Sequence, residues 1–67
     1  MTYWSNLGTD RTYRFEIRRS VRNEPYWVLI AGNGEIVAVS EMYKSEQACK
    51  HSIEAVHANA SSAKLPW

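Results

Sequence analysis

The sequence predicts a small α+β domain, in which an antiparallel sheet carries one helix on one of its faces. Three observations lead to this fold class. Apolar and charged residues alternate over residues 13–18, two β-rich runs are joined by Gly32-Asn33-Gly34-Glu35, and the hydrophobic period changes from two to about 3.6 after Lys44. The expected order is strand, strand, strand, helix and a short last strand.

The first strand is expected over residues 13–18. Tyr13, Phe15 and Ile17 alternate there with Arg14, Glu16 and Arg18, which is the pattern of a half-buried strand with one apolar and one charged side. Residues 1–11 show no such period, so we expect them to form a loose leader before a single domain over residues 12–67.

The second and third strands are expected over residues 26–31 and 35–40, with Asn33-Gly34 as the connecting turn. Asn-Gly favours a two-residue type I′ turn, because both residues adopt φ > 0 at little cost. This turn pairs Ala31 with Ile36, Leu29 with Ala38 and Trp27 with Ser40.

That register divides the sheet into two faces. The face beneath the helix is expected to hold Phe15, Ile17, Trp27, Leu29, Ala31, Ile36 and Ala38. The second face holds Tyr26, Val28, Ile30, Val37 and Val39, and it is unusually apolar. An apolar sheet face of this size is either covered or acts as a contact surface. We expect Trp4 or Trp67, from the same chain or from a partner, to pack on it.

A helix is expected to begin after Ser45, whose hydroxyl is a good N-cap, and Glu46 favours the positive end of its dipole. Its apolar stripe consists of Ala48, Cys49, Ser52, Ile53, Val56 and Ala60. Residues 59–63 form a polar exit, and Lys64-Leu65-Pro66-Trp67 is expected to be the last short strand.

A chain of 67 residues buries too little surface to be more than marginally stable by itself. Its single cysteine excludes an internal disulfide, and Cys49, His51 and His57 do not have the spacing of a structural zinc site. Oligomerisation is the remaining common way for such a domain to gain core. The size of the chain therefore predicts a homodimer.

The formal net charge of +1 gives no electrostatic case for nucleic acid or an anionic membrane as an obligatory partner. No apolar run reaches the roughly 20 residues of a membrane span, and residues 1–6 lack the pattern of a signal peptide. These features indicate a soluble protein of the reducing cytoplasm.

This order of elements, with the motifs Asn33-Gly34-Glu35-Ile36, Ser40-Glu41, Tyr43-Lys44-Ser45 and Ile53-Glu54-Ala55-Val56, resembles the YegP-like family of small bacterial proteins (domain of unknown function 1508, UPF0339). The resemblance covers residues 13–59. It implies a β-β-β-α-β unit, two of which share one sheet and exchange their C-terminal strands. Because one unit is present here, the resemblance implies a homodimer. The family brings no established activity.

Two departures from the family pattern bear on these expectations. Pro66 cannot donate to a β-ladder, which weakens a strand exchange. Val28 and Ile30 stand where family members commonly have polar residues, which makes the second face of the sheet more apolar than usual.

No catalytic, cofactor or metal site is expected. Cys49 lies in the apolar stripe without a base near it in the sequence, as a buried structural cysteine does. His51, Glu54 and His57 spread over about 120° of the helix surface, which is typical of a solvated face. The chain is therefore not expected to be an enzyme.

The candidate functional residues form an interaction surface. They are Tyr26, Val28, Ile30, Val37 and Val39 of the second face, together with Arg14 and Arg18 of the first strand. The leading interpretation is a non-enzymatic homodimer that takes part in protein interaction or structural support, with an unidentified protein as a further partner. The alternative is a weak nucleic-acid-binding module that uses the arginine-rich first strand.

Overall fold

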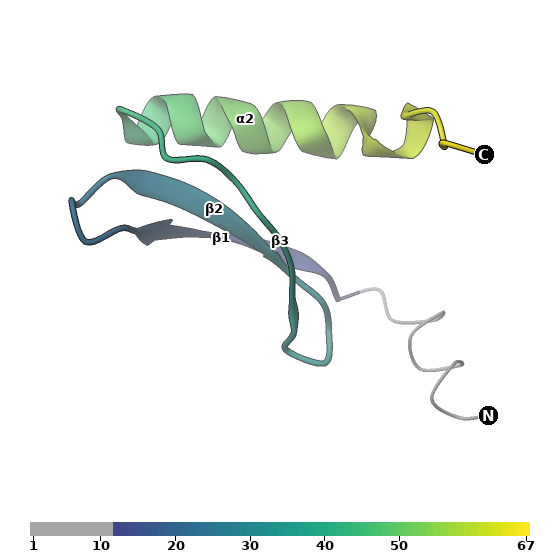
Figure 1. Cartoon of the computed structure of the whole chain (residues 1–67), viewed down its shortest axis with the longest axis horizontal. Coiled ribbons are helices and arrows are strands. Elements are labelled where there is room, and N and C mark those ends of the chain that lie inside the picture. Colours follow the sequence, from purple (N-terminus) through teal and green to yellow (C-terminus); the bar gives the residue numbers. More distant parts are fainter. Residues whose placement is uncertain (1–11) are drawn as a thin grey trace.

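The structure is a computed structural model, and it describes residues 12–67. Its elements are the strands β1 (Arg14–Arg19), β2 (Pro25–Ile30) and β3 (Ile36–Val39), the helix α2 (Glu46–Asn59) and the 3-10 turn η1 (Ala60–Ser62). The three strands form an antiparallel sheet in the order β1-β2-β3, and α2 lies along one of its faces (Figure 1). The predicted α+β class, with one helix on an antiparallel sheet, is confirmed.

The loop between β2 and β3 is not the predicted type I′ turn. The N–H of Gly34 donates to the carbonyl of Ala31 at 2.8 Å, and the N–H of Ala31 donates to the carbonyl of Glu35 at 2.8 Å. Gly34 has φ +91°, whereas Asn33 does not have a positive φ. This is the pattern of a three-residue loop, in which a turn is followed by one left-handed residue. Gly32 therefore belongs to the loop, and Asn33 caps it by accepting from the N–H of Glu35 at 3.0 Å.

The longer loop changes the register next to the turn. Ile36 pairs with Ile30, where the sequence predicted a pairing with Ala31, and an irregularity follows between Leu29 and Ile30. Val37 is the extra residue that restores the predicted pairing of Leu29 with Ala38. Side chains of paired residues share a face, so Ile36 lies on the face of Ile30 and not beneath the helix.

The loop between β1 and β2 has the same hydrogen-bond pattern. The N–H of Asn23 donates to the carbonyl of Ser20 at 2.8 Å, and the N–H of Ser20 donates to the carbonyl of Glu24 at 2.9 Å. Asn23 occupies the left-handed position with φ 63°, which asparagine tolerates better than most residues. The Ser20 hydroxyl accepts from the N–H groups of Arg22 and Glu24, both at 3.2 Å.

Trp27 joins the sheet to the helix. Its side chain is 8% exposed, and its ring meets that of Phe15 edge-on with centroids 5.3 Å apart. The indole Nε1–H donates to the Ser52 hydroxyl on α2 at 3.0 Å, and the Tyr43 hydroxyl donates to the same oxygen at 2.6 Å. Because Ser52 serves both donors, the polar atoms beneath the helix are satisfied.

The helix begins as predicted. The Ser45 hydroxyl accepts from the N–H of Ala48 at 3.1 Å, and Glu46 lies in the first turn. The side of α2 that meets the sheet is narrower than the predicted stripe. It consists of Cys49, Ser52, Ile53 and Val56, while Ala48 and Ala60 are exposed.

The core of the described residues is small. Its buried apolar side chains are Trp27, Val28, Ile30, Ala31 and Cys49. Several residues predicted to fill the space between sheet and helix are only half-buried, namely Phe15, Ile17, Leu29, Ile53 and Val56. Figure 1 shows the reason: β2 runs obliquely to α2, so the C-terminal half of the helix covers less of the sheet than its N-terminal half.

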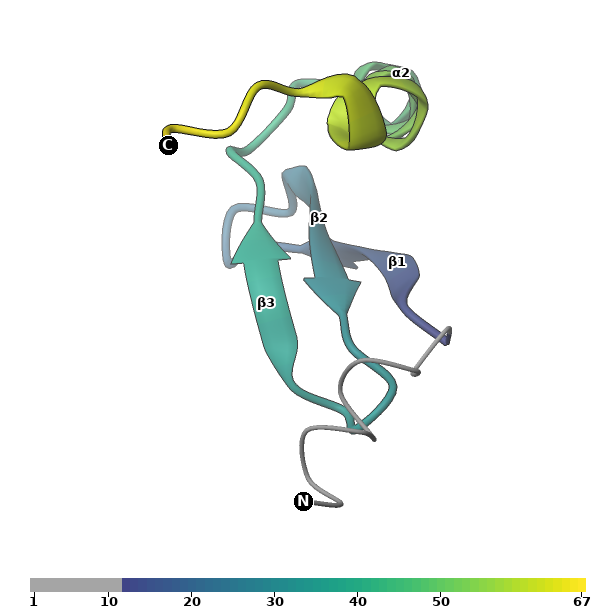
Figure 2. The same ribbon diagram turned by 90° about the vertical axis from the view of Figure 1, so that its right-hand side faces the viewer.

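The predicted last strand does not form in the single chain. Residues 64–67 have no regular secondary structure, and in Figure 2 they run out on the side of β3 without joining the sheet. Leu65 is 66% exposed and Trp67 is 90% exposed, so Trp67 does not cover the second face of its own chain. The other tryptophan expected there, Trp4, lies outside the described residues, as does the expected leader over residues 1–11.

Candidate interaction surface

The face of the sheet opposite α2 is here called the open face. Cross-strand pairing places Arg14, Glu16 and Arg18 of β1 beside Ile30, Val28 and Tyr26 of β2, and places Ile36 and Val39 of β3 on the other side of the same residues. These side chains alternate with those that meet the helix. Figures 1 and 2 show no helix or strand of residues 12–67 over this face.

The centre and the β3 side of the open face differ in exposure. Val28 and Ile30 on the central strand are 2% and 3% exposed, so they form the floor of the face. Ile36, Val37 and Val39 on the outer strand are 47%, 49% and 59% exposed. The water-accessible apolar area therefore lies along β3.

The structure brings most of the predicted surface residues together. Tyr26, Val28, Ile30 and Val39 share the open face with Arg14 and Arg18, as the alternation of the strands predicted. Val37 sits at the irregularity, and the place predicted for it opposite Ile30 is taken by Ile36. Sequence reasoning missed Ile36 because it read Asn33-Gly34 as a two-residue loop. The glycine on each side of Asn33 was the available signal for a longer one.

The β1 side of the open face carries more positive than negative charge. The Arg14 Nε donates to Glu16 Oε2 at 3.1 Å, and the Arg18 Nη2 donates to Glu16 Oε1 at 3.2 Å. The hydrogen bonds from Arg18 and Arg14 lower the pKa of the Glu16 carboxyl below its usual value. Two guanidinium groups share one carboxylate, so the cluster keeps one net positive charge.

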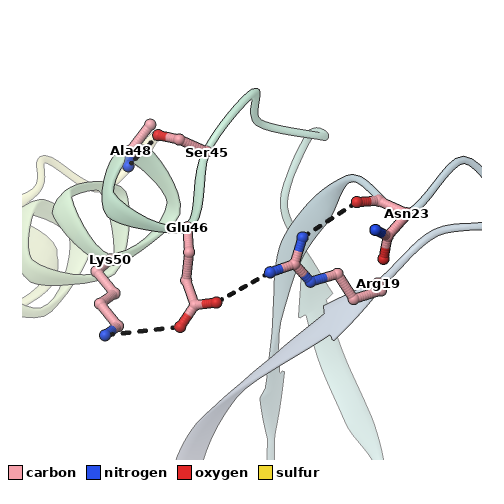
Figure 3. Close-up of polar contacts among 6 residues, drawn as sticks. All are labelled: Arg19, Asn23, Ser45, Glu46, Ala48 and Lys50. Atoms are coloured by element: carbon pink, nitrogen blue, oxygen red, sulfur yellow. Dashed lines mark hydrogen bonds and ion pairs between the residues drawn. The ribbon is translucent and has the colours of Figure 1, made fainter.

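A further arginine of β1 lies on the helix side of the sheet. The Arg19 Nη2 donates to Glu46 Oε1 of α2 at 3.0 Å, and its Nη1 donates to the carbonyl of Asn23 at 3.1 Å (Figure 3). The second oxygen of Glu46 lies 3.6 Å from the Lys50 Nζ. Arg19 thus attaches the first turn of the helix to the end of β1.

The potential catalytic and metal-binding residues lie apart from the open face. Cys49 is fully buried, and this burial raises the pKa of its thiol, which keeps the reactive thiolate form rare. His51 and Glu54 line a shallow depression along the outer side of α2 together with Glu46, Gln47 and Lys50. Among residues 12–67, no three His, Cys, Asp or Glu side chains are grouped as metal ligands.

In the part of the chain that the structure describes, no helix combines the length and the apolar character that crossing a bilayer requires.

Similarity to known proteins supports the resemblance seen in the sequence. UPF0339 protein YegP of Yersinia pestis is 41% identical over 46 residues, which are 69% of this chain and 41% of that protein. A UPF0339 protein of Treponema denticola is 44% identical over 52 residues, which are 78% of this chain and 90% of that protein. The chain thus spans less than half of the YegP protein and nearly all of the Treponema protein.

The family also extends beyond bacteria. A UPF0339 protein of the archaeon Methanosarcina acetivorans is 38% identical over 59 residues, which are 88% of this chain and 81% of that protein. The solution structure of a protein from Haloferax volcanii superimposes with a TM-score of 0.74 at 34% identity, covering 82% of this chain and 93% of that one. Residues 20–65 match the domain of unknown function DUF1508. The chain therefore belongs to the DUF1508 family, which includes the UPF0339 proteins.

Proposed function

We propose that this chain is a non-enzymatic, homodimeric domain of the cytoplasm whose role is protein interaction or structural support. The observation that carries the proposal is the incomplete burial of apolar side chains between the sheet and the C-terminal half of α2. Phe15, Leu29, Ile53 and Val56 lie on the facing sides of these two layers, yet all four are only half-buried. Among residues 12–67 only five hydrophobic side chains form the buried core, so a second copy would contribute the missing core.

The outer strands indicate where the second copy would join. β1 carries Arg14, Glu16 and Arg18, and charges of this kind protect a sheet edge from pairing with another chain. β3 consists of Ile36, Val37, Ala38 and Val39, and it has no such protection. We infer that the two sheets join along β3.

The C-terminal segment supports the same arrangement. Leu65 and Trp67 are apolar and largely exposed. The C-terminal end of the chain lies on the side of β3 in Figure 2. Packed against a partner, both side chains would leave water. The exchange of C-terminal segments implied by the family resemblance would achieve this, with Pro66 limiting the ladder to a few hydrogen bonds.

Nucleic-acid binding has less support than dimerisation. The arginine-rich first strand motivated this alternative, but Glu16 neutralises part of the charge of Arg14 and Arg18, and Arg19 is held by Glu46. Binding of single-stranded oligonucleotides that weakens steeply with salt would establish it instead.

Size-exclusion chromatography with light scattering tests the dimer. We expect twice the chain mass of 7.7 kDa at micromolar concentration, and a mass near 7.7 kDa would refute the proposal. A double variant, Leu65→Ser with Trp67→Ser, should shift the dimer toward the monomer. Val21→Ser is the matched control, because Val21 is a fully exposed apolar residue in the β1–β2 loop, outside the C-terminal segment. Equal behaviour of the two variants would show that the C-terminal segment does not hold the dimer.

A further inference from the structure

The open face has the features of a docking site for a partner of defined chemistry. It combines the accessible apolar strip of Ile36 and Val39 on β3 with the net positive cluster of Arg14, Glu16 and Arg18 on β1. Neighbouring strands lie about 4.8 Å apart, so strip and cluster are separated by roughly 10 Å. An α-helix has a diameter of about 10 to 12 Å, so one helix lying over β2 would touch both.

The covered face of the same sheet provides the template. There α2 places an apolar stripe on the sheet and a carboxylate, Glu46, on an arginine of β1, Arg19, at 3.0 Å (Figure 3). Because side chains alternate along a strand, Arg14 and Arg18 point to the other face. On that face the described residues provide arginines and an apolar floor, but no covering helix.

The arginines of the open face retain donors for a partner. Each guanidinium makes one hydrogen bond to Glu16, and the side chains of Arg14 and Arg18 remain 56% and 43% exposed. A guanidinium has five N–H donors, so a single bond to Glu16 leaves most of them available to other acceptors. A carboxylate from a partner would also balance the net charge of the cluster.

We propose that the open face binds an amphipathic helix of another protein, with an apolar stripe flanked by acidic residues. The stripe packs on Ile36 and Val39, the accessible apolar side chains of this face, and the acidic side chains reach Arg14 and Arg18. These arginines are four strand positions apart, roughly 13 Å, which two helical turns of about 11 Å approximately match. The partner's acidic residues should therefore recur about seven or eight positions apart. This inference rests on the proposed interaction role and names the partner class.

Synthetic peptides test the proposal. The probe is a fluorescein-labelled helical peptide of about 18 residues, long enough at 1.5 Å per residue to span the strands, with leucines on one stripe and glutamates along one flank. Its matched controls are the same peptide with lysines in place of the glutamates, and a scrambled peptide without a stripe. Fluorescence anisotropy with the full chain should show binding of the acidic peptide at least about tenfold tighter than that of the lysine peptide, with the difference reduced at high salt.

Variants identify the binding face. Arg14→Gln combined with Arg18→Gln should remove the preference for the acidic peptide, whereas Arg22→Gln, in the β1–β2 loop, should retain it. Val39→Ser should weaken binding of the acidic peptide, whereas Val21→Ser, at another exposed valine, should not. Circular dichroism confirms that each variant is folded. Equal affinities for the acidic and lysine peptides, or equal effects of the paired variants, would overturn the proposal.

Two further measurements distinguish a partner helix from other occupants of the open face. If the acidic peptide binds only after residues 1–8 are deleted, the chain's own leader occupies the open face and the proposal is wrong. If the Arg14 and Arg18 substitutions convert a dimer to a monomer in light scattering, a second copy occupies the face and the proposal is again wrong. A monomeric chain that binds the acidic peptide selectively would refute the dimer and leave the docking site standing.

Discussion

The two faces of the sheet are built from the same three strands but have different partners. On the helix face, Arg19 meets Glu46, a residue 27 positions further along the chain. On the open face, Arg14 and Arg18 meet Glu16, two positions away on their own strand. A distant carboxylate links a second layer to the sheet, whereas a local carboxylate only reduces the net charge and leaves Arg14 and Arg18 partly exposed. The sequence separation of the ion pairs thus distinguishes the face that carries α2 from the opposite face.

The largest loss of stability is expected on the helix face, at Trp27. Trp27→Ala removes a buried ring, its edge-on contact with Phe15 and a donor to Ser52. Unfolding by denaturant, followed by circular dichroism, should show a loss of about 3 to 5 kcal/mol. Trp27→Phe retains an aromatic ring and loses the indole N–H, so it should cost less. A loss below about 1 kcal/mol for Trp27→Ala would mean that the helix is not held by this residue.

A cross-strand pair on the open face gives the next largest effect. Ile30 and Ile36 are paired and chemically identical, but they are 3% and 47% exposed. Ile30→Ala should cost about 2 to 5 kcal/mol, whereas Ile36→Ala should cost less than about 1 kcal/mol. The measurement is the free energy of unfolding at several protein concentrations. Equal losses of stability for the two variants at every protein concentration would show that the open face is covered as fully as the helix face.

Local sequence patterns predict most elements of this fold but not the exact turn between β2 and β3. The alternation in β1, the Ser45 cap and the pairing of Leu29 with Ala38 are all predictable, because each depends on neighbouring residues or on a repeating pattern. The exact turn was mispredicted because Gly32 and Gly34 permit more than one loop length around Asn33. The difference of one residue is absorbed at Val37, so Ile36 moves to the open face and takes the predicted place of Val37 opposite Ile30.

Substitutions at the two loop positions with positive φ are expected to change the stability of the chain in opposite directions. Gly34 has φ +91° and Asn23 has φ 63° at equivalent places in the two hairpins. Gly34→Ala should destabilise the chain by about 1 to 2 kcal/mol through backbone strain, since no atom lies within 4 Å of the added Cβ. Asn23→Gly should leave stability unchanged or raise it. Melting temperatures of both variants test this, and a stabilising Gly34→Ala would contradict the loop geometry.

The candidate surface was less predictable than the fold. The alternation placed Arg14 and Arg18 correctly on one face with Val28 and Ile30. It carried no information on burial, however, so the near-complete burial of Val28 beside a half-buried Leu29 could not be foreseen. The oblique crossing of α2 and β2, a property of the packed layers and not of any local pattern, accounts for the partial exposure of Leu29. It does not account for the burial of Val28, which lies on the other face of the sheet.

The ion pair that connects the helix to the sheet should contribute little to stability. The Arg19 and Glu46 side chains are 45% and 50% exposed, and exposed pairs of this kind typically contribute about 0.2 to 1 kcal/mol. A double-mutant cycle with Arg19→Gln and Glu46→Gln measures the coupling, with Lys50→Gln as a control for the second cation near Glu46. A coupling energy of zero would show that apolar contacts alone position α2.

The smallest effect is the pH response of the open face. The pKa of Glu16 is lowered by Arg18 and Arg14, so the folded chain binds this proton less readily than the unfolded chain does. The stability from Glu16 is therefore present above its unfolded pKa and is lost as the pH falls through its lower folded pKa. Carboxyl carbon shifts in an NMR titration should give a Glu16 midpoint that rises when Arg14 and Arg18 are both replaced by glutamine. An unchanged midpoint would mean that the arginines do not hold this carboxylate in solution. In that case both guanidinium groups would be free for a partner's acidic side chains, and the preference for an acidic helix should be stronger.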